Sequence, residues 1–290
     1  MGFILGLLAA LSFSATSILA RIGQRTRPND DGVFISVFVN VVLLGVAAAL
    51  TTWPAWDTAA MVSFVIGGVI GTVGGRTSLL RGVRLIGPSR SNAMVTGAPV
   101  VAAFAGWLVL GEHIRPVEML GGALVIGGVL WLISARSSDD PGSRRASLIA
   151  YLIAAGAPLS FGLAFVFRKW GLERFDSSLV GAWVGSTSAF VGIMLLEAGR
   201  SRLGSRVKEN FRSPSWWFVG AGVTSTVALL SQFTAFRYLE AWVVGVLQAT
   251  QALWTIGLSL IFLRQEERID ASLVGSVALV VSGVVLIAVA

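Results

Sequence analysis

Residues 11–23, LSFSATSILARIG, return 148 residues later as residues 159–171, LSFGLAFVFRKWG. Each stretch opens with Leu-Ser-Phe, and the first closes with Arg21-Ile22-Gly23 where the second closes with Lys169-Trp170-Gly171. Farther along, the first half carries Glu112, Gly121 and Gly128, which have counterparts in Glu266, Gly275 and Gly283. The chain therefore consists of two related halves.

The composition indicates an integral membrane protein. Of the 290 residues, 55% are hydrophobic and only 13% are charged, and the mean hydropathy is +0.80. Soluble domains carry about 25% charged residues. A net charge of +7 would point to nucleic acid in a soluble protein. Here the basic residues lie in short gaps between apolar stretches, so the expected partner is the lipid bilayer and not nucleic acid.

Ten apolar windows are long enough to approach the roughly 20 residues that cross a bilayer as a helix. The sequence therefore predicts an all-α integral membrane protein with ten transmembrane helices in two five-helix repeats. Because each repeat holds an odd number of spans, the second copy is expected to lie inverted relative to the first. The predicted organisation is a first repeat at 1–135, a linker at 136–145 and a second repeat at 146–290. The windows are 2–20, 32–51, 61–80, 91–110, 117–134, 146–167, 178–196, 216–236, 241–263 and 271–290.

The basic residues predict the orientation of these spans. On the ten-span arrangement, 17 of the 22 Lys and Arg residues fall in the odd-numbered loops, and five, including Arg168 and Arg237, fall on the other side. The cytoplasmic side retains the positive charge. We therefore expect a multi-pass protein of the cell (plasma) membrane with both termini extracytoplasmic.

The order of motifs across the two copies resembles the EamA-like family of the drug/metabolite transporter (DMT) superfamily. Pro99 is followed by an apolar run into Leu110-Gly111-Glu112, and Phe262-Leu263-Arg264-Gln265-Glu266-Glu267 holds the equivalent place in the second copy. The resemblance implies ten helices around a central cavity and alternating access for small organic solutes, often with export as the outcome. Its best-known bacterial members are described with both termini inside, whereas the arginine distribution here favours the opposite orientation.

The function expected from these features is a secondary active transporter that moves a small organic metabolite, with export favoured. The alternatives are a flippase for a lipid-linked intermediate and a non-transporting membrane scaffold. An enzyme is not expected, since the chain has no Cys and one His, His113, and so offers neither a metal set nor a dyad. No cofactor or metal is expected, and an oligomer is not required.

Charged groups inside a bilayer are costly and therefore informative. The spans carry no central carboxylate, which disfavours the proton-coupled efflux of lipophilic cations that related small multidrug transporters perform with a carboxylate in their first span. Arg76 is the one candidate cation, near the end of the third window. It either anchors an anionic substrate through bidentate hydrogen bonds or extends to the cytoplasmic interface.

Uncharged polar residues supply the other candidates for a substrate site. Asn92 and Thr96 lie one helical turn apart, and Gln248 and Gln251 lie three residues apart on the equivalent window of the second copy. Gln232 projects from the eighth window, and Trp254 is expected to extend the face of Gln251 with an aromatic wall. Each polar side chain has the alternative of hydrogen-bonding a neighbouring helix.

Other repeated features are expected to serve the scaffold. Gly67, Gly71 and Gly75 follow a spacing that lets helices approach closely. Pro99 and Pro158 fall inside spans, where proline bends or breaks a helix. Arg84 and Arg237 occupy matching positions in the two copies and are expected at opposite faces of the bundle.

Overall fold

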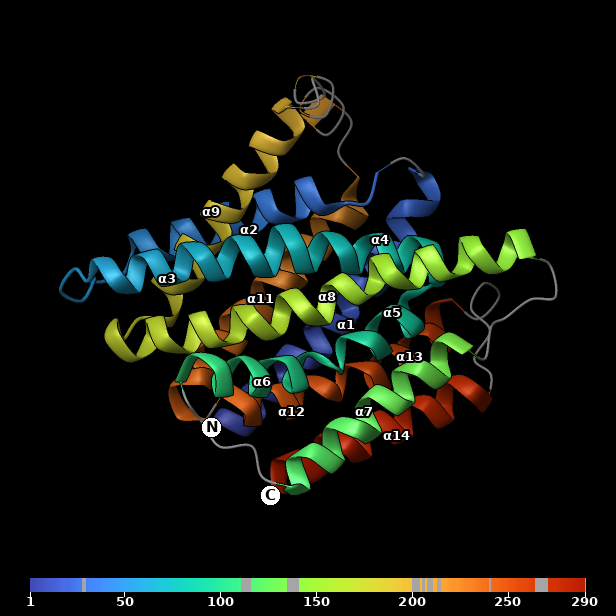
Figure 1. Cartoon of the computed structure of the whole chain (residues 1–290). Helices are drawn as coiled ribbons and strands as arrows, with labels where there is room; N and C mark the ends of the chain where they lie inside the picture. The colour runs from blue at the N-terminus through green and yellow to red at the C-terminus, as the bar shows by residue number, and fades with distance from the viewer. Residues whose placement is uncertain are drawn as a thin grey trace.

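A computed structural model of the chain describes residues 1–27, 30–110, 116–134, 141–199, 204, 207, 211–212, 215–239, 241–263 and 271–289. Within these ranges all regular secondary structure is helical. Glu112, His113, Glu266 and residues 136–140 of the predicted linker lie outside them. The elements, shown in Figure 1, are α1 (Gly2–Thr26), α2 (Val33–Ala49), α3 (Thr58–Gly68), the π-helix η1 (Val69–Arg76), α4 (Thr77–Ile86), α5 (Pro88–Val95), α6 (Ala98–Leu110), α7 (Pro116–Ser134), α8 (Pro141–Arg174), α9 (Ser178–Gly199), α11 (Trp216–Tyr238), α12 (Ala241–Ala249), α13 (Gln251–Phe262) and α14 (Ala271–Val289).

Every predicted window overlaps helical residues, which confirms the all-α membrane class. Among the described residues, six helical stretches are long and apolar enough to cross a bilayer, and one of them, Val243–Phe262, includes the turn at Thr250. Another, Thr58–Ile86, joins α3, η1 and α4 into a single stretch. Other apolar helices, such as α2, are shorter, so the exact number of ten spans stays a prediction. Helix α8 begins at Pro141, five residues before the expected window.

The two halves pack into each other in a reciprocal pattern. The first helix of each half contacts the third helical stretch of the other, so that α1 packs on α11 and α8 packs on α3 and α4. Equivalent elements also meet directly, α2 against α9 and α7 against α14. Figure 1 shows α7 and α14 side by side and running in opposite directions. The core therefore lies between the halves and not within either one.

A glycine and a phenylalanine form the same contact at both ends of this pattern. Phe218 of α11 lies against Gly23 of α1, where an added methyl group would approach within 2.5 Å of the ring. Phe64 of α3 lies against Gly171 of α8, where the corresponding distance is 2.6 Å. Both rings are fully buried, at 0% exposure. Only glycine allows the rings this close, so the two copies keep one packing solution.

The glycines of the third span confirm their predicted packing role. Gly67, Gly71 and Gly75 all face α8, against Phe167, Ala164 and Phe161 respectively. Their four-residue spacing places them on one side of the helix, and the absence of side chains lets α8 approach closely.

Two apolar stretches are interrupted at equivalent positions. A break at Thr96 and Gly97 separates α5 from α6, and a break at Thr250 separates α12 from α13. Each threonine hydroxyl donates to the carbonyl three residues earlier, at 2.5 Å from Thr96 and 2.6 Å from Thr250. Pro99 follows the first break, as its missing N–H requires, whereas α8 continues through Pro158 without interruption.

The chain reverses between α4 and α5 at Gly87. Its φ of +86° lies in the region that residues with a side chain rarely adopt. Pro88 then starts α5, where its fixed φ suits the first helical position. This turn returns the chain from the third span to the interrupted fourth stretch.

The main chains of α3 and α9 approach closely at Gly68, so we expect a substitution there to destabilise the protein. A methyl group at Gly68 would overlap the main chain of Gly185 on α9, which is rigid and cannot give way. We expect Gly68→Ala to force α3 and α9 apart and to lower the melting temperature of the purified protein in detergent. Gly127→Ala is the control, because nothing lies within 4 Å of that position on α7. Alanine forms helices better than glycine, so the control should be neutral or slightly stabilised; equal melting temperatures for both variants would contradict this packing.

Candidate functional site

A cavity lies where the two halves meet. Its walls come from α1, η1, α4, α5 and α6 of the first half and from α8, α11, α12 and α13 of the second. The wall is mostly apolar and includes three aromatic rings, Phe13, Phe161 and Phe165. The polar side chains that reach it are Thr16, Thr72, Arg76, Arg168, Gln232, Gln248 and Gln251.

Arg76 reaches this cavity from the end of η1 and is only 8% exposed. A π-helix has wider turns than an α-helix and is frequent at functional sites. Arg76 Nη1 donates to Asn40 Oδ1 of α2 at 2.9 Å, with the Asn40 amide oriented so that its NH₂ group points to the Gly222 and Ser36 carbonyls. The reverse orientation would direct that NH₂ at the guanidinium. Nε and Nη2 of Arg76 have no hydrogen-bond acceptor.

Arg168 reaches the same cavity from α8 and is 4% exposed. Its Nη1 donates to Gln232 Oε1 of α11 at 2.9 Å, while Nε has no acceptor. The guanidinium lies 5.4 Å from the centre of the Phe233 ring, a cation–π distance. It also lies over Gly71, where an added methyl group would come within 2.6 Å of Nη2. Gly71 thus makes room for the guanidinium as well as for α8.

The predicted site residues Arg76, Gln232, Gln248 and Gln251 all line the cavity. Gln248 is 6% exposed, and its Nε2 has no acceptor. Gln232 is bound to Arg168, and so positions a charge. The structure therefore brings together four of the seven predicted side chains around one space.

Asn92 and Thr96 are fully buried but do not line the cavity. Asn92 Nδ2 donates to the Pro88 carbonyl at 2.9 Å, and Asn92 Oδ1 accepts from Gln251 Nε2. Thr96 bonds within its own turn. The helix-to-helix alternative therefore describes Asn92, and Thr96 contributes to the helix break.

Trp254 does not form the expected aromatic wall. The buried stripe of α13 runs through Gln251, Ala252, Thr255 and Ser259. Trp254 lies outside that stripe and is 43% exposed. The three-residue step from Gln251 rotates the ring out of the stripe, because the helix buries one narrow face. The aromatic lining comes instead from α1 and α8.

Comparison with known proteins supports the architecture. The model of the EamA-like transporter family matches residues 1–134 and 148–289. The chain belongs to the EamA-like transporter family. A crystal structure described only as "Crystal structure of protein" superposes with a TM-score of 0.62 and 16% sequence identity, over 99% of this chain and 97% of the other. At that identity it shows the fold alone, and no curated protein matches the chain.

The sequence did not predict two polar side chains at the site of this EamA-like transporter, Arg168 and Asn40. Arg168 was assigned to a loop, because the sixth window ended at Phe167. The repeat would have indicated the correct placement of Arg168. Its equivalent 148 residues earlier is Ala20, which lies inside α1 and is 0% exposed. Asn40 lies inside the second window, 32–51, and so carried the same signal as the glutamines, an amide within a span. Its partners appear only where α2 meets η1 and α11. When Arg76 and Arg168 are left out of the count, the odd-numbered loops still carry more Lys and Arg residues than the other side.

The lining of the cavity offers groups that can bind a solute. It presents hydrogen-bond donors and apolar surface, and its described residues include no Asp or Glu. In the part of the chain that the structure describes, no three His, Asp or Glu side chains gather as a metal site requires. A solute in this space would meet guanidinium and amide groups as well as aromatic rings.

The pair formed by Asn92 and Gln251 predicts a structural coupling. Loss of either partner leaves a buried amide without its hydrogen bond, which is costly. We expect Asn92→Ala and Gln251→Ala each to lower the melting temperature, and the double variant to lose less than the sum. Interhelical hydrogen bonds in membranes are worth about 0.6 to 1.7 kcal/mol, so unfolding of all four proteins in mixed micelles should give a coupling of that size. Strict additivity would show that the two amides do not depend on each other.

Proposed function

We propose that this EamA-like transporter is a secondary active transporter that carries a small organic metabolite through the central cavity by alternating access, with net export. The observation that carries the proposal is the cavity itself. It is built from both halves, lies beside the two helix breaks, and combines a few placed polar groups with an apolar wall. Small-molecule sites have this composition.

The paired breaks support a moving site. Ala98 and Pro99 at the start of α6 line the cavity, and so does Gln251 at the start of α13. Transporters with repeated halves bind their solutes where such discontinuous helices meet. Gly245 of α12 lies against Pro99 of α6, so the two broken stretches touch beside the cavity. Their movement relative to each other would open the cavity to one side or the other.

The absence of cysteine allows a direct test of alternating access. Leu229→Cys places a thiol on the cavity wall. We expect a membrane-impermeant thiol reagent to modify it from either side of oriented, sealed vesicles, because the cavity opens alternately to each. A transported solute should slow the modification.

Leu253→Cys is the matched control for this experiment. Leu253 is 51% exposed on the outer surface of α13, where lipid would surround it. A thiol in hydrocarbon does not ionise and reacts slowly, so this variant should stay unmodified from both sides. Modification of Leu229→Cys from one side only would contradict alternating access.

Solute flux separates the transporter from its two alternatives. Candidate solutes come from a thermal-shift screen of the purified protein, because ligands that bind the folded state raise its stability. Uptake or efflux of such a solute in reconstituted vesicles supports the transporter. A flippase would move lipid but no free metabolite, and a scaffold would move neither.

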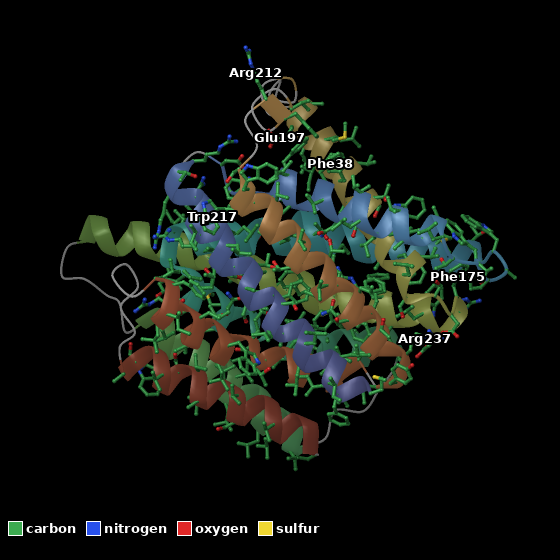
Figure 2. The ribbon with its side chains drawn as sticks, turned by 180° about the vertical axis from the view of Figure 1, so that it is seen from behind. Phe38, Phe175, Glu197, Arg212, Trp217 and Arg237 are labelled. Atoms are coloured by element: carbon green, nitrogen blue, oxygen red, sulfur yellow. The ribbon has the colours of Figure 1, made fainter. Side chains whose placement is uncertain are left out.

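We also propose that the protein lies in the plasma membrane with both termini extracytoplasmic. The cytoplasm-facing end would then include Arg81 of α4, which pairs with Asp31 at 3.5 Å. The opposite end holds Phe175 and Arg237, which Figure 2 shows together, with Arg237 paired to Asp176 at 2.5 Å. A tag at the carboxyl terminus should be cut by protease added to intact cells. Full protection of the tag, with cleavage only after lysis, would reverse the orientation.

A further inference from the structure

Two buried arginines from different halves converge on the cavity, and its described lining residues include no carboxylate. Arg76 comes from the first half and Arg168 from the second, and both line the same space. Ion pairs among the described residues include those of Arg81, Lys169, Arg174 and Arg237, which join Asp31, Glu173, Asp57 and Asp176. None of those eight residues lines the cavity. The protein partners identified for the two guanidinium groups, Asn40 and Gln232, are neutral amides.

The donors left over belong to three residues of the cavity wall. Among the described residues, Nε and Nη2 of Arg76, Nε of Arg168 and Nε2 of Gln248 are buried and without acceptors. A buried donor without an acceptor is costly, and more so when it is charged. A guanidinium keeps its proton under all ordinary conditions. The site therefore has two positive charges and at least four donors to satisfy.

An anion satisfies both requirements at once. Carboxylate and phosphate oxygens accept several hydrogen bonds and match the planar fork of arginine. The starts of α6 and α13 add to the attraction, because a helix N-terminus carries partial positive charge, and both reach the cavity. Among the described residues, the lining contains no carboxylate that would repel an anion.

The rest of the wall defines the other end of the ligand. Phe13, Phe161 and Phe165 lie on it with Leu79, Leu80 and Leu229. A bare inorganic anion would leave this apolar surface in contact with water. An apolar or aromatic body would cover it and gain the free energy of burial.

We propose that the cavity binds an amphiphilic organic anion, with its carboxylate or phosphate group between Arg76 and Arg168 and its apolar body against the rings of α1 and α8. This inference rests on the proposed transport function and specifies its substrate class. Arg168 and Arg76 act as a pair contributed by both halves, so neither half alone could hold the anion.

Four probes of matched shape test the charge requirement. They are 3-phenylpropionate, phenyl phosphate, 3-phenylpropylamine and 3-phenylpropanol, each added to the purified protein in neutral detergent. The two anions should raise the melting temperature, whereas the amine and the alcohol should not. Equal shifts with the amine or the alcohol would overturn the proposal. An equal shift with inorganic phosphate alone would overturn the role of the apolar body.

Substitution of each arginine tests the pairing. A hydrogen bond to a charged group is worth about 1.5 to 3 kcal/mol, so Arg76→Gln and Arg168→Gln should each weaken binding of 3-phenylpropionate about 10- to 100-fold. Arg237→Gln is the control, because its ion pair is exposed at the end of the bundle and should leave affinity unchanged. Unchanged affinity in both cavity variants would overturn the proposal.

Lysine variants guard against a failure to fold. Arg76→Lys and Arg168→Lys keep the charge but lose the planar fork, and should bind 3-phenylpropionate between the wild type and the Gln variants. If a Gln variant does not yield a monodisperse protein, the corresponding Lys variant carries the test. A Lys variant that binds the anion as tightly as the wild type would then contradict the bidentate arrangement.

The source of the anion and the transport function are tested in separate arms. Competition by an anionic phospholipid such as phosphatidylglycerol, without any binding of free 3-phenylpropionate, would assign the arginines to a lipid headgroup and overturn the proposal. Flux of an uncharged solute that is indifferent to Arg76→Gln would overturn the anion site and leave the transporter intact. Anion binding without flux of any solute would leave the site intact and remove the transport function.

Discussion

The close approach of the first helix of each half to the third span of the other is the contact on which the rest of the structure depends. Gly23 accepts Phe218, and Gly171 accepts Phe64, in the same manner. Helices in lipid gain little from hydrophobic attraction to each other, so tight packing at small residues has to hold them. Because each contact joins one half to the other, neither half could form its core alone. The cavity is the space left between these two crossed pairs.

The shared scaffold holds a site that is not symmetric. The position equivalent to Arg168 in the first half is occupied by Ala20, and the position equivalent to Arg76 in the second half is occupied by Leu230. Two charges with only neutral amide neighbours are expensive in a low-dielectric setting. Asn40 and Gln232 offset part of that cost and fix the directions of the guanidinium groups. The remaining donors give the cavity its preference for negative charge.

The sequence was sufficient for the class, the duplication and the helical stretches, because long apolar windows and repeated motifs follow local rules. It also located Arg76, Gln232, Gln248 and Gln251, since polar groups are rare in spans. It could not decide which polar groups face each other: Asn92 binds Gln251, and this depends on how α5 meets α13. The position of Trp254 differs from the expected cavity wall for a related reason, because a helix position next to the buried stripe already faces outward. Arg168 was assigned to a loop because the predicted window ended at Phe167, seven residues before the end of α8 at Arg174.

The matched breaks at Thr96 and Thr250 have a consequence for the energy of conformational exchange. Each half already contains one interrupted helix with one threonine bonded back to its own turn. If each half adopted the conformation of the other, every main-chain hydrogen bond broken in one half would form in the other. The total number of main-chain hydrogen bonds would then stay constant. The two conformers would then be nearly degenerate in backbone energy. Their relative populations would be set by the few side chains that have no twin, above all the two arginines.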